Sequence, residues 1–265
     1  MTVQEFIDGS AAPDISWDQA PARIKVIGVG VGGCNCVRRM LAHEAVPGVE
    51  FVVVNTDIKS LETVKQGAEV IQIGQKSTQG WGEGGDYSLG VRAAEESSSV
   101  LRRALKDAEL VFITAGMGGG TGTGAAPYVA YLAKEMGAVV VGVVTTPFSF
   151  EGSRRLDRAI AGVSRLRPYV DNLIVIHNDR LLEFVDHDAE MLEAFRTADE
   201  VVTQGIMSLS ELINVPGQIN VDFADVQTVM SNPGGALMAI GTGHGHMGAL
   251  EAAKQAIANP LLNLS

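Results

Sequence analysis

The sequence has few cysteines, few aromatic residues and no excess of basic ones. Cys34 and Cys36 are the two cysteines, and their spacing is too short for an ordinary structural disulfide, which fits a reducing cytosol. Twenty Lys and Arg stand against 31 Asp and Glu, a formal net charge of −11. Because such a surface repels phosphate groups and anionic lipids, we expect no nucleic-acid partner.

Long hydrophobic runs are also missing. No apolar stretch approaches the roughly 18 residues of a membrane span, and the N-terminus lacks a basic region followed by an apolar core. We therefore expect a cytoplasmic protein without direct membrane insertion. Hydrophobic residues make up 46% of the 265 residues and charged residues 19%, which is typical of a folded globular chain that needs no disulfide or metal to form a core.

Composition and periodicity divide the chain into four parts. Residues 1–21 contain acidic residues but no base, and predict a disordered acidic tail. Residues 22–187 are expected to form the main domain, residues 188–216 a central helix, and residues 217–265 the start of an incomplete C-terminal domain.

The main domain alternates strand and helix patterns. Short, β-branched apolar runs predict strands covered on both faces: Ile24–Val29, Phe51–Val54, Leu110–Thr114, Val139–Val144 and Leu173–Ile176. Helical patterns lie between them or follow them: Asn35–His43, Leu89–Lys106, Thr123–Met136 and Arg154–Leu166. This alternation predicts an α/β fold with a doubly wound, mainly parallel sheet, whose ligands bind at the carboxyl ends of the strands.

A long helix and three further elements are predicted after the sheet. An apolar stripe with three-or-four spacing runs from Met191 to Ile213 and stops before Pro216-Gly217. A short helix from about Asp222, a strand at Ala236–Ile240 and a helix from about Gly248 to Ala258 follow. These elements would begin a second domain that the chain does not finish.

The first strand leads into a glycine-rich loop, Gly28–Asn35. Glycines there let the backbone approach an anion closely while the next helix points its N–H groups at it, so the loop predicts a phosphate site. Gly28, Gly30 and Gly33 also satisfy the G-x-G-x-x-G pattern, with Asp57 beyond the second strand, as in NAD-binding Rossmann domains. A third interpretation is a turn that needs glycine only for tight packing.

A second glycine-rich loop follows a later strand and again opens a helix. Its core, Gly118–Gly124, contains only Gly and Thr, so that backbone N–H groups and two hydroxyls can surround a di- or triphosphate. A dinucleotide dehydrogenase has no need of such a loop. The sequence has no P-loop lysine, so helix dipoles, backbone amides and bound Mg²⁺ would have to meet the phosphate charge.

At these residues the chain resembles the tubulin/FtsZ family of GTPases. The matching segments extend over almost everything after the tail: Gly118–Gly124, Ile24–Gly30, Asn55–Asp57, Thr145–Phe148, Glu151-Gly152, Asn178–Arg180 and Asn220–Val226. The resemblance implies that residues 22–187 are a GTPase domain that binds GTP or GDP with Mg²⁺. It also implies a head-to-tail homopolymer, a filament of the cell-division cytoskeleton located at the division site.

The resemblance implies a role for each site residue. Phosphate would be held by Gly30, Val31, Gly32, Gly33, Cys34 and Asn35, together with Gly120, Thr121 and Gly122. Glu151 and Arg155 would contact the ribose side, although their i,i+4 spacing also suits a surface ion pair.

For the base, Asn35 and Asp199 would read guanine while Phe195 stacks on it; Phe195 also suits a core position on the apolar stripe. The assignment of Asp199 is chemically sensible, because a carboxylate accepts from both N1–H and N2–H₂ of guanine.

Neither glycine loop supplies an acid or a base to orient the attacking water. The resemblance implies that Asn220, Asp222 and Asp225 of the next subunit supply these groups, so that self-assembly activates hydrolysis. Asp222 and Asp225 are three residues apart at a predicted helix start, where they could polarise water or simply cap the helix.

Several residues depart from the family pattern. Val31 and Cys34 replace glycines and are expected to crowd the phosphate cradle, although Cys34 is more readily interpreted as a buried, inert thiol than as a reactive one. Glu83 replaces a small residue, and a carboxylate beside the γ-phosphate would repel it unless Mg²⁺ intervened or the side chain turned away. His244 and His246 lack a third ligand, which favours a solvated turn over a metal site.

Family members continue into a complete second domain, whereas this sequence stops at Ser265. We expect either a fragment or a naturally short relative. An alternative function is therefore a GTP/GDP-binding module with little activity of its own, which caps or co-assembles with full-length FtsZ-type filaments. Other division proteins are further candidate partners.

Overall fold

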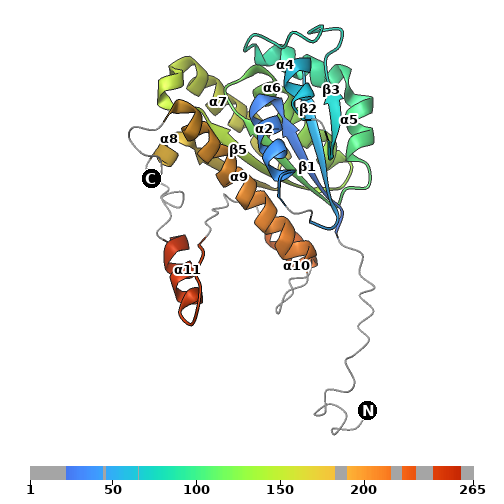
Figure 1. Cartoon of the computed structure of the whole chain (residues 1–265). Coiled ribbons are helices and arrows are strands. Elements are labelled where there is room, and N and C mark those ends of the chain that lie inside the picture. Colours follow the sequence, from blue (N-terminus) through green and yellow to red (C-terminus); the bar gives the residue numbers. More distant parts are fainter. Residues whose placement is uncertain are drawn as a thin grey trace, which may run out of the picture.

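A computed structural model describes residues 22–43, 46–64, 66–182, 190–215, 223–230 and 241–257. Its centre is one six-stranded sheet with the order β3-β2-β1-β4-β5-β6 (Figure 1). The strands are β1 (Ile24–Val29), β2 (Val49–Asn55), β3 (Ala68–Gln72), β4 (Leu110–Gly116), β5 (Val139–Thr146) and β6 (Asn172–His177). Every neighbouring pair is parallel, which confirms the predicted doubly wound fold class.

The helices follow the strands in the predicted alternation. They are α2 (Gly30–Met40), α3 (Ile58–Glu62), α4 (Tyr87–Glu96), α5 (Ser98–Leu105), α6 (Gly120–Glu135), α7 (Ser153–Leu166), α8 (Asn178–Leu181), α9 (Met191–Asn214), α10 (Phe223–Met230) and α11 (Gly248–Ile257). Two short 3₁₀ helices, Ser149–Glu151 and Arg167–Tyr169, flank α7. Among the described residues, no helix combines the length and apolarity that crossing a membrane requires.

Helices cover both faces of the sheet, and strand alternation divides the core between them. Ile27 and Val29 of β1 join a buried cluster with residues of α4, α5, α6 and α7. Ile24 and Val26 point to the other face, where the cluster includes residues of α2 and α9. The period of two along the strand thus assigns alternate side chains to two apolar layers.

Three details differ from the sequence-based expectations. The helical pattern 89–106 is two helices, α4 and α5, which meet at Ser97. Strand β3 was not predicted; it lies at the sheet edge, where Glu69 and Val70 are exposed. Helix α2 begins at Gly30, directly after β1 and five residues before its predicted start at Asn35. The predicted strand Ala236–Ile240 lies outside the described residues.

The strand order changes direction between β1 and β4. The chain adds β2 and β3 on one side of β1, and then β4, β5 and β6 on the other. Helices α2 and α6 therefore begin next to each other at the carboxyl edge of the sheet, and a Cβ added to Gly30 would lie 2.9 Å from the Gly122 nitrogen. Such a switch point is where doubly wound sheets bind ligands.

Candidate functional site

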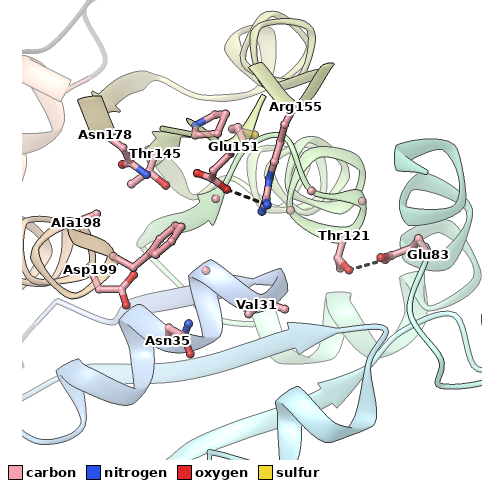
Figure 2. A pocket seen from close by; sticks show the side chains of 18 of the residues that line it. Val31, Asn35, Glu83, Thr121, Thr145, Glu151, Arg155, Asn178, Ala198 and Asp199 are labelled. Atoms are coloured by element: carbon pink, nitrogen blue, oxygen red, sulfur yellow. Dashed lines mark hydrogen bonds and ion pairs between the residues drawn. The ribbon is translucent and has the colours of Figure 1, made fainter. Parts of the chain in front are cut away.

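A pocket of about 410 Å³ opens at this switch point. Its wall comes from the starts of α2 and α6, the ends of β4 and β5, the start of α7, and α9 (Figure 2). Ten of the predicted site residues line it: Val31, Gly32, Asn35, Gly120, Thr121, Gly122, Glu151, Arg155, Phe195 and Asp199. Asn35 of α2 and Phe195 of α9, which are 160 positions apart in the sequence, thus line the same cavity.

Three predicted phosphate residues, Gly30, Gly33 and Cys34, do not line the pocket. Gly33 packs against the sheet, since a Cβ there would lie 2.4 Å from the Thr114 carbonyl oxygen. Gly30 has φ +73°, a left-handed conformation that favours glycine. At these two positions glycine is needed for close packing of α2 against its neighbours, in agreement with the tight-packing interpretation of the first loop.

The prediction that the Cys34 side chain crowds the phosphate cradle is wrong, because this side chain points into the core. It is buried in the core with 2% exposure, and the Asn55 amide Nδ2 lies 4.0 Å from its sulfur. The expected burial of this thiol is confirmed, and burial raises its pKa to about 12, which disfavours the reactive thiolate. Val31, by contrast, is 56% exposed and lines the pocket as expected.

Glu151 and Arg155 form an ion pair at the pocket wall. Arg155 Nη1 lies 2.8 Å from Glu151 Oε2, and the Phe148 N–H donates to the other carboxylate oxygen at 2.8 Å. The Glu151 side chain is 8% exposed and that of Arg155 48%. The pair is therefore partly buried and fixed in orientation, which distinguishes it from a free surface pair.

The position of Phe195 is compatible with either predicted role, stacking on a base or packing on the apolar stripe. Its half-buried ring makes an edge contact with Phe148 at 5.1 Å between centroids, and it also lines the pocket. Asp199 lies one helical turn further along α9, so the two side chains reach the same end of the cavity.

The Asp199 carboxylate is held by groups of α2. Arg39 Nε donates to Oδ2 at 3.3 Å, and the Cys36 thiol donates to Oδ1 at 3.6 Å. Burial raises the pKa of Asp199 above its ordinary value, while the hydrogen bond and charge of Arg39 oppose that shift. Each carboxylate oxygen retains acceptor capacity for donors from a ligand.

Asn178 was named in the sequence only as part of a motif, and it is a site residue by position. It follows β6, is 5% exposed and lines the pocket; its Oδ1 atom is buried without a hydrogen-bond partner. A buried acceptor of this kind costs about 1–3 kcal/mol if it stays unpaired, and a donor from a ligand or a water molecule in the pocket would satisfy it. The usable signal was its place at a strand end, which Thr145 of β5 shares.

The opposite end of the pocket contains Glu83. Its carboxylate accepts hydrogen bonds from the Thr56 hydroxyl at 2.7 Å and from the Thr121 hydroxyl. Figure 2 shows Glu83 and Thr121 facing each other, far from Asn178 and Asp199. The side chain has not turned away from the glycine loop, one of the possibilities considered for it.

Asn220 and Asp222, predicted to complete catalysis, lie outside the described residues. Asp225 is exposed in the first turn of α10. His244 and His246 are both exposed in the segment before α11. Within the described ranges, no three His, Cys, Asp or Glu side chains are grouped as a metal site would need.

A parallel sheet with two glycine-rich loops at its switch point, both of which line one pocket, defines a nucleotide-binding α/β protein. Residues 23–186 match the Tubulin/FtsZ family, GTPase domain. The chain belongs to this family.

Solved structures agree with the family match. An FtsZ dimer of M. jannaschii, described as empty, is 40% identical, with a TM-score of 0.88 over 99% of this chain and 74% of that one. A mutant FtsZ from M. jannaschii is 41% identical, with a TM-score of 0.87 over 98% and 75%. CetZ2 from Haloferax volcanii, a GTPγS-bound protofilament, is 26% identical, with a TM-score of 0.71 over 83% and 65%.

Proposed function

We propose that this chain binds GTP in the switch-point pocket, hydrolyses it to GDP and phosphate, and assembles head to tail into filaments. The observation that carries the proposal is the order of the residues along the pocket: Thr121 of the glycine loop lies at one end and Asp199 at the other (Figure 2), with Phe195 one helical turn from Asp199 on α9. A guanine nucleotide has the matching order of phosphates, ribose and base. In the cell we place it in the cytoplasm, at the division site.

The lining suits a guanine nucleotide in its parts. The N–H groups at the start of α6 face phosphate, and the ordered Glu151–Arg155 pair borders the ribose position. The buried Asn178 Oδ1, which has no partner within the protein, would accept a hydrogen bond from the nucleoside. Mg²⁺ would be held chiefly by phosphate oxygens, with the Glu83 carboxylate and the Thr121 hydroxyl nearest, and would neutralise charge on the phosphates.

Completion of the site by a second copy is supported by the state of the pocket carboxylates. Glu83, Glu151 and Asp199 are the acids that line it, and each already accepts hydrogen bonds from the protein. No histidine lines the pocket among the described residues. These carboxylates are engaged in holding the pocket together, so we assign the orientation of the attacking water to Asn220, Asp222 and Asp225 of the next subunit.

Self-association is also supported by the neighbours, one an FtsZ dimer and another a CetZ2 protofilament. Head-to-tail contacts between identical copies do not close, so an open filament is the expected product. Filaments of a division cytoskeleton are the cellular role that we propose for it.

The test is GTP hydrolysis per molecule over a range of protein concentrations, with sedimentation of the same samples. We expect turnover to rise above a threshold concentration together with pelleted protein. Asp222→Ala should abolish turnover and retain nucleotide. Glu69→Gln removes an exposed acid on the edge strand β3, which contributes no residue to the pocket, and should change neither turnover nor nucleotide binding.

Two results would contradict the proposal. GTP that fails to bind would refute the site itself. Turnover that stays flat while GTP binds and nothing pellets would refute the assembling enzyme; slowed turnover by an added full-length FtsZ-type filament would then favour the capping module.

A further inference from the structure

The Glu83 carboxylate lies against the start of α6. A Cβ added to Gly120 would be 2.8 Å from Glu83 Oε2 and 2.9 Å from the Glu83 Cβ, so the side chain covers the first residue of the helix. The N-terminus of a helix of 16 residues attracts negative charge through its free N–H groups and its dipole. Glu83 therefore supplies from within the chain a charge of the kind that a phosphate would bring.

The hydroxyl groups around Glu83 have few protons to share. Thr121 Oγ1 lies within hydrogen-bond distance of Glu83 Oε1, of Thr56 Oγ1 at 3.1 Å, and of Asn55 Oδ1 at 3.2 Å. Each hydroxyl carries one proton, and the Asn55 oxygen and the Glu83 carboxylate can only accept. A phosphate oxygen that enters here competes with Glu83 for these hydroxyl donors.

The position along the pocket identifies which phosphate is affected. Asp199 lies at the end of the pocket proposed for the base, and the Glu151–Arg155 pair lies between it and Thr121 of the glycine loop (Figure 2). Glu83 lies at the far end (Figure 2). The group nearest to it is consequently the last phosphate of the chain, which GTP has and GDP lacks.

We propose that Glu83 is a specificity-determining residue that competes with the terminal phosphate, so that the free protein favours GDP over GTP unless a divalent cation bridges the two anions. The inference rests on the proposed nucleotide function of the pocket. It adds to that function a built-in preference between its two nucleotides and assigns the preference to one side chain.

Calorimetric titration of the whole chain with GDP and GTP, in EDTA and in Mg²⁺, tests the proposal. In EDTA the unmodified protein should bind GDP about tenfold more tightly than GTP, an effect of the size expected for two like charges a few ångströms apart. Glu83→Gln keeps the shape and removes the charge, and should lower the ratio of the two dissociation constants to about one. In Mg²⁺ the variant and the unmodified protein should differ little.

Glu69→Gln changes the net charge equally and should leave the ratio unchanged. Equal effects of Glu83→Gln on both nucleotides, or a selective loss of GTP in EDTA, would overturn the inference. If that variant does not fold, the unmodified protein still decides: equal affinities in EDTA overturn it. Failure of GDP to bind at all would instead refute the proposed function.

Discussion

Replacing Asp199 by asparagine tests the base end of the pocket. Asp199 is 18% exposed and lies beside Phe195 on α9. If its carboxylate accepts from N1–H and N2–H₂ of guanine, the amide keeps one acceptor and turns a donor toward the 2-amino group. Two hydrogen bonds to a charged acceptor contribute about 1.5–3 kcal/mol each, so losing most of this should weaken GDP binding by about 100-fold or more.

The assay is calorimetric titration with GDP and with XDP, in which a carbonyl oxygen replaces the 2-amino group. Asp199→Asn should bind XDP more tightly than GDP, because its amide N–H matches that carbonyl. Glu200→Gln is the matched control: Glu200 also lies near Arg39, at 3.6 Å, but its side chain is 60% exposed and does not line the pocket. Undiminished GDP binding by Asp199→Asn, with a normal thermal unfolding curve, would refute guanine recognition by this carboxylate.

Three further predictions concern conformation, pH and reactivity. Gly30→Ala should lower the free energy of unfolding in urea by about 2 kcal/mol or more, because φ is +73° and the added Cβ meets the Gly122 nitrogen. Gly137→Ala, with φ +90° and nothing within 4 Å, should cost only about 1 kcal/mol; equal losses would contradict the packing argument. Burial raises the pKa of Asp199 above its ordinary value near 4, so the carboxylate becomes protonated at a higher pH than an ordinary aspartate. GDP should therefore bind above that pKa, and its affinity should fall on acidification before pH 4 is reached. An affinity that stays unchanged down to about pH 4 would contradict this prediction. Since the pKa of Cys34 is about 12, only about one thiol in ten thousand is ionised at pH 8, and mass spectrometry should find Cys34 unmodified by iodoacetamide in the folded protein.

The sequence predicted the sheet well because its central strands are buried on both faces. The run Ile24–Val29 coincides with β1, and Leu110–Thr114 lies within β4. Strand β3 has the opposite character: it lies at the sheet edge, Glu69 and Val70 are exposed, and Glu69 and Gln72 interrupt its apolar residues. Burial set by the neighbours, rather than local propensity, decides which short segments can be recognised.

The candidate site was predictable in its loops and less so in its individual side chains. Two glycine-rich segments after strands were recognisable without any knowledge of the fold, and both line the pocket. Asn178 could not be separated from other polar residues at strand ends, because its significance lies in a buried oxygen that has no partner. Asp199 of α9 contacts Arg39 and Cys36 of α2, which lie at least 160 residues earlier in the sequence. Helical and strand periodicities relate only residues close in sequence, so they could not predict this contact.

Some glycines of the two loops line the pocket and others pack against neighbouring backbone, so phosphate binding and tight packing were both reasonable interpretations. Gly30 approaches the backbone of Gly122, and a Cβ added to Gly122 would in turn lie 2.6 Å from the carbonyl oxygen of Gly116. The loop after β1 thus packs directly on the loop after β4, which is itself closely packed from Gly116 to Gly122. Because the two loops share these contacts, a substitution on the packed side should alter ligand binding without touching the ligand. Glu83 lies on Gly120 within the same unit, so its charge acts on a cradle that cannot easily move away from it.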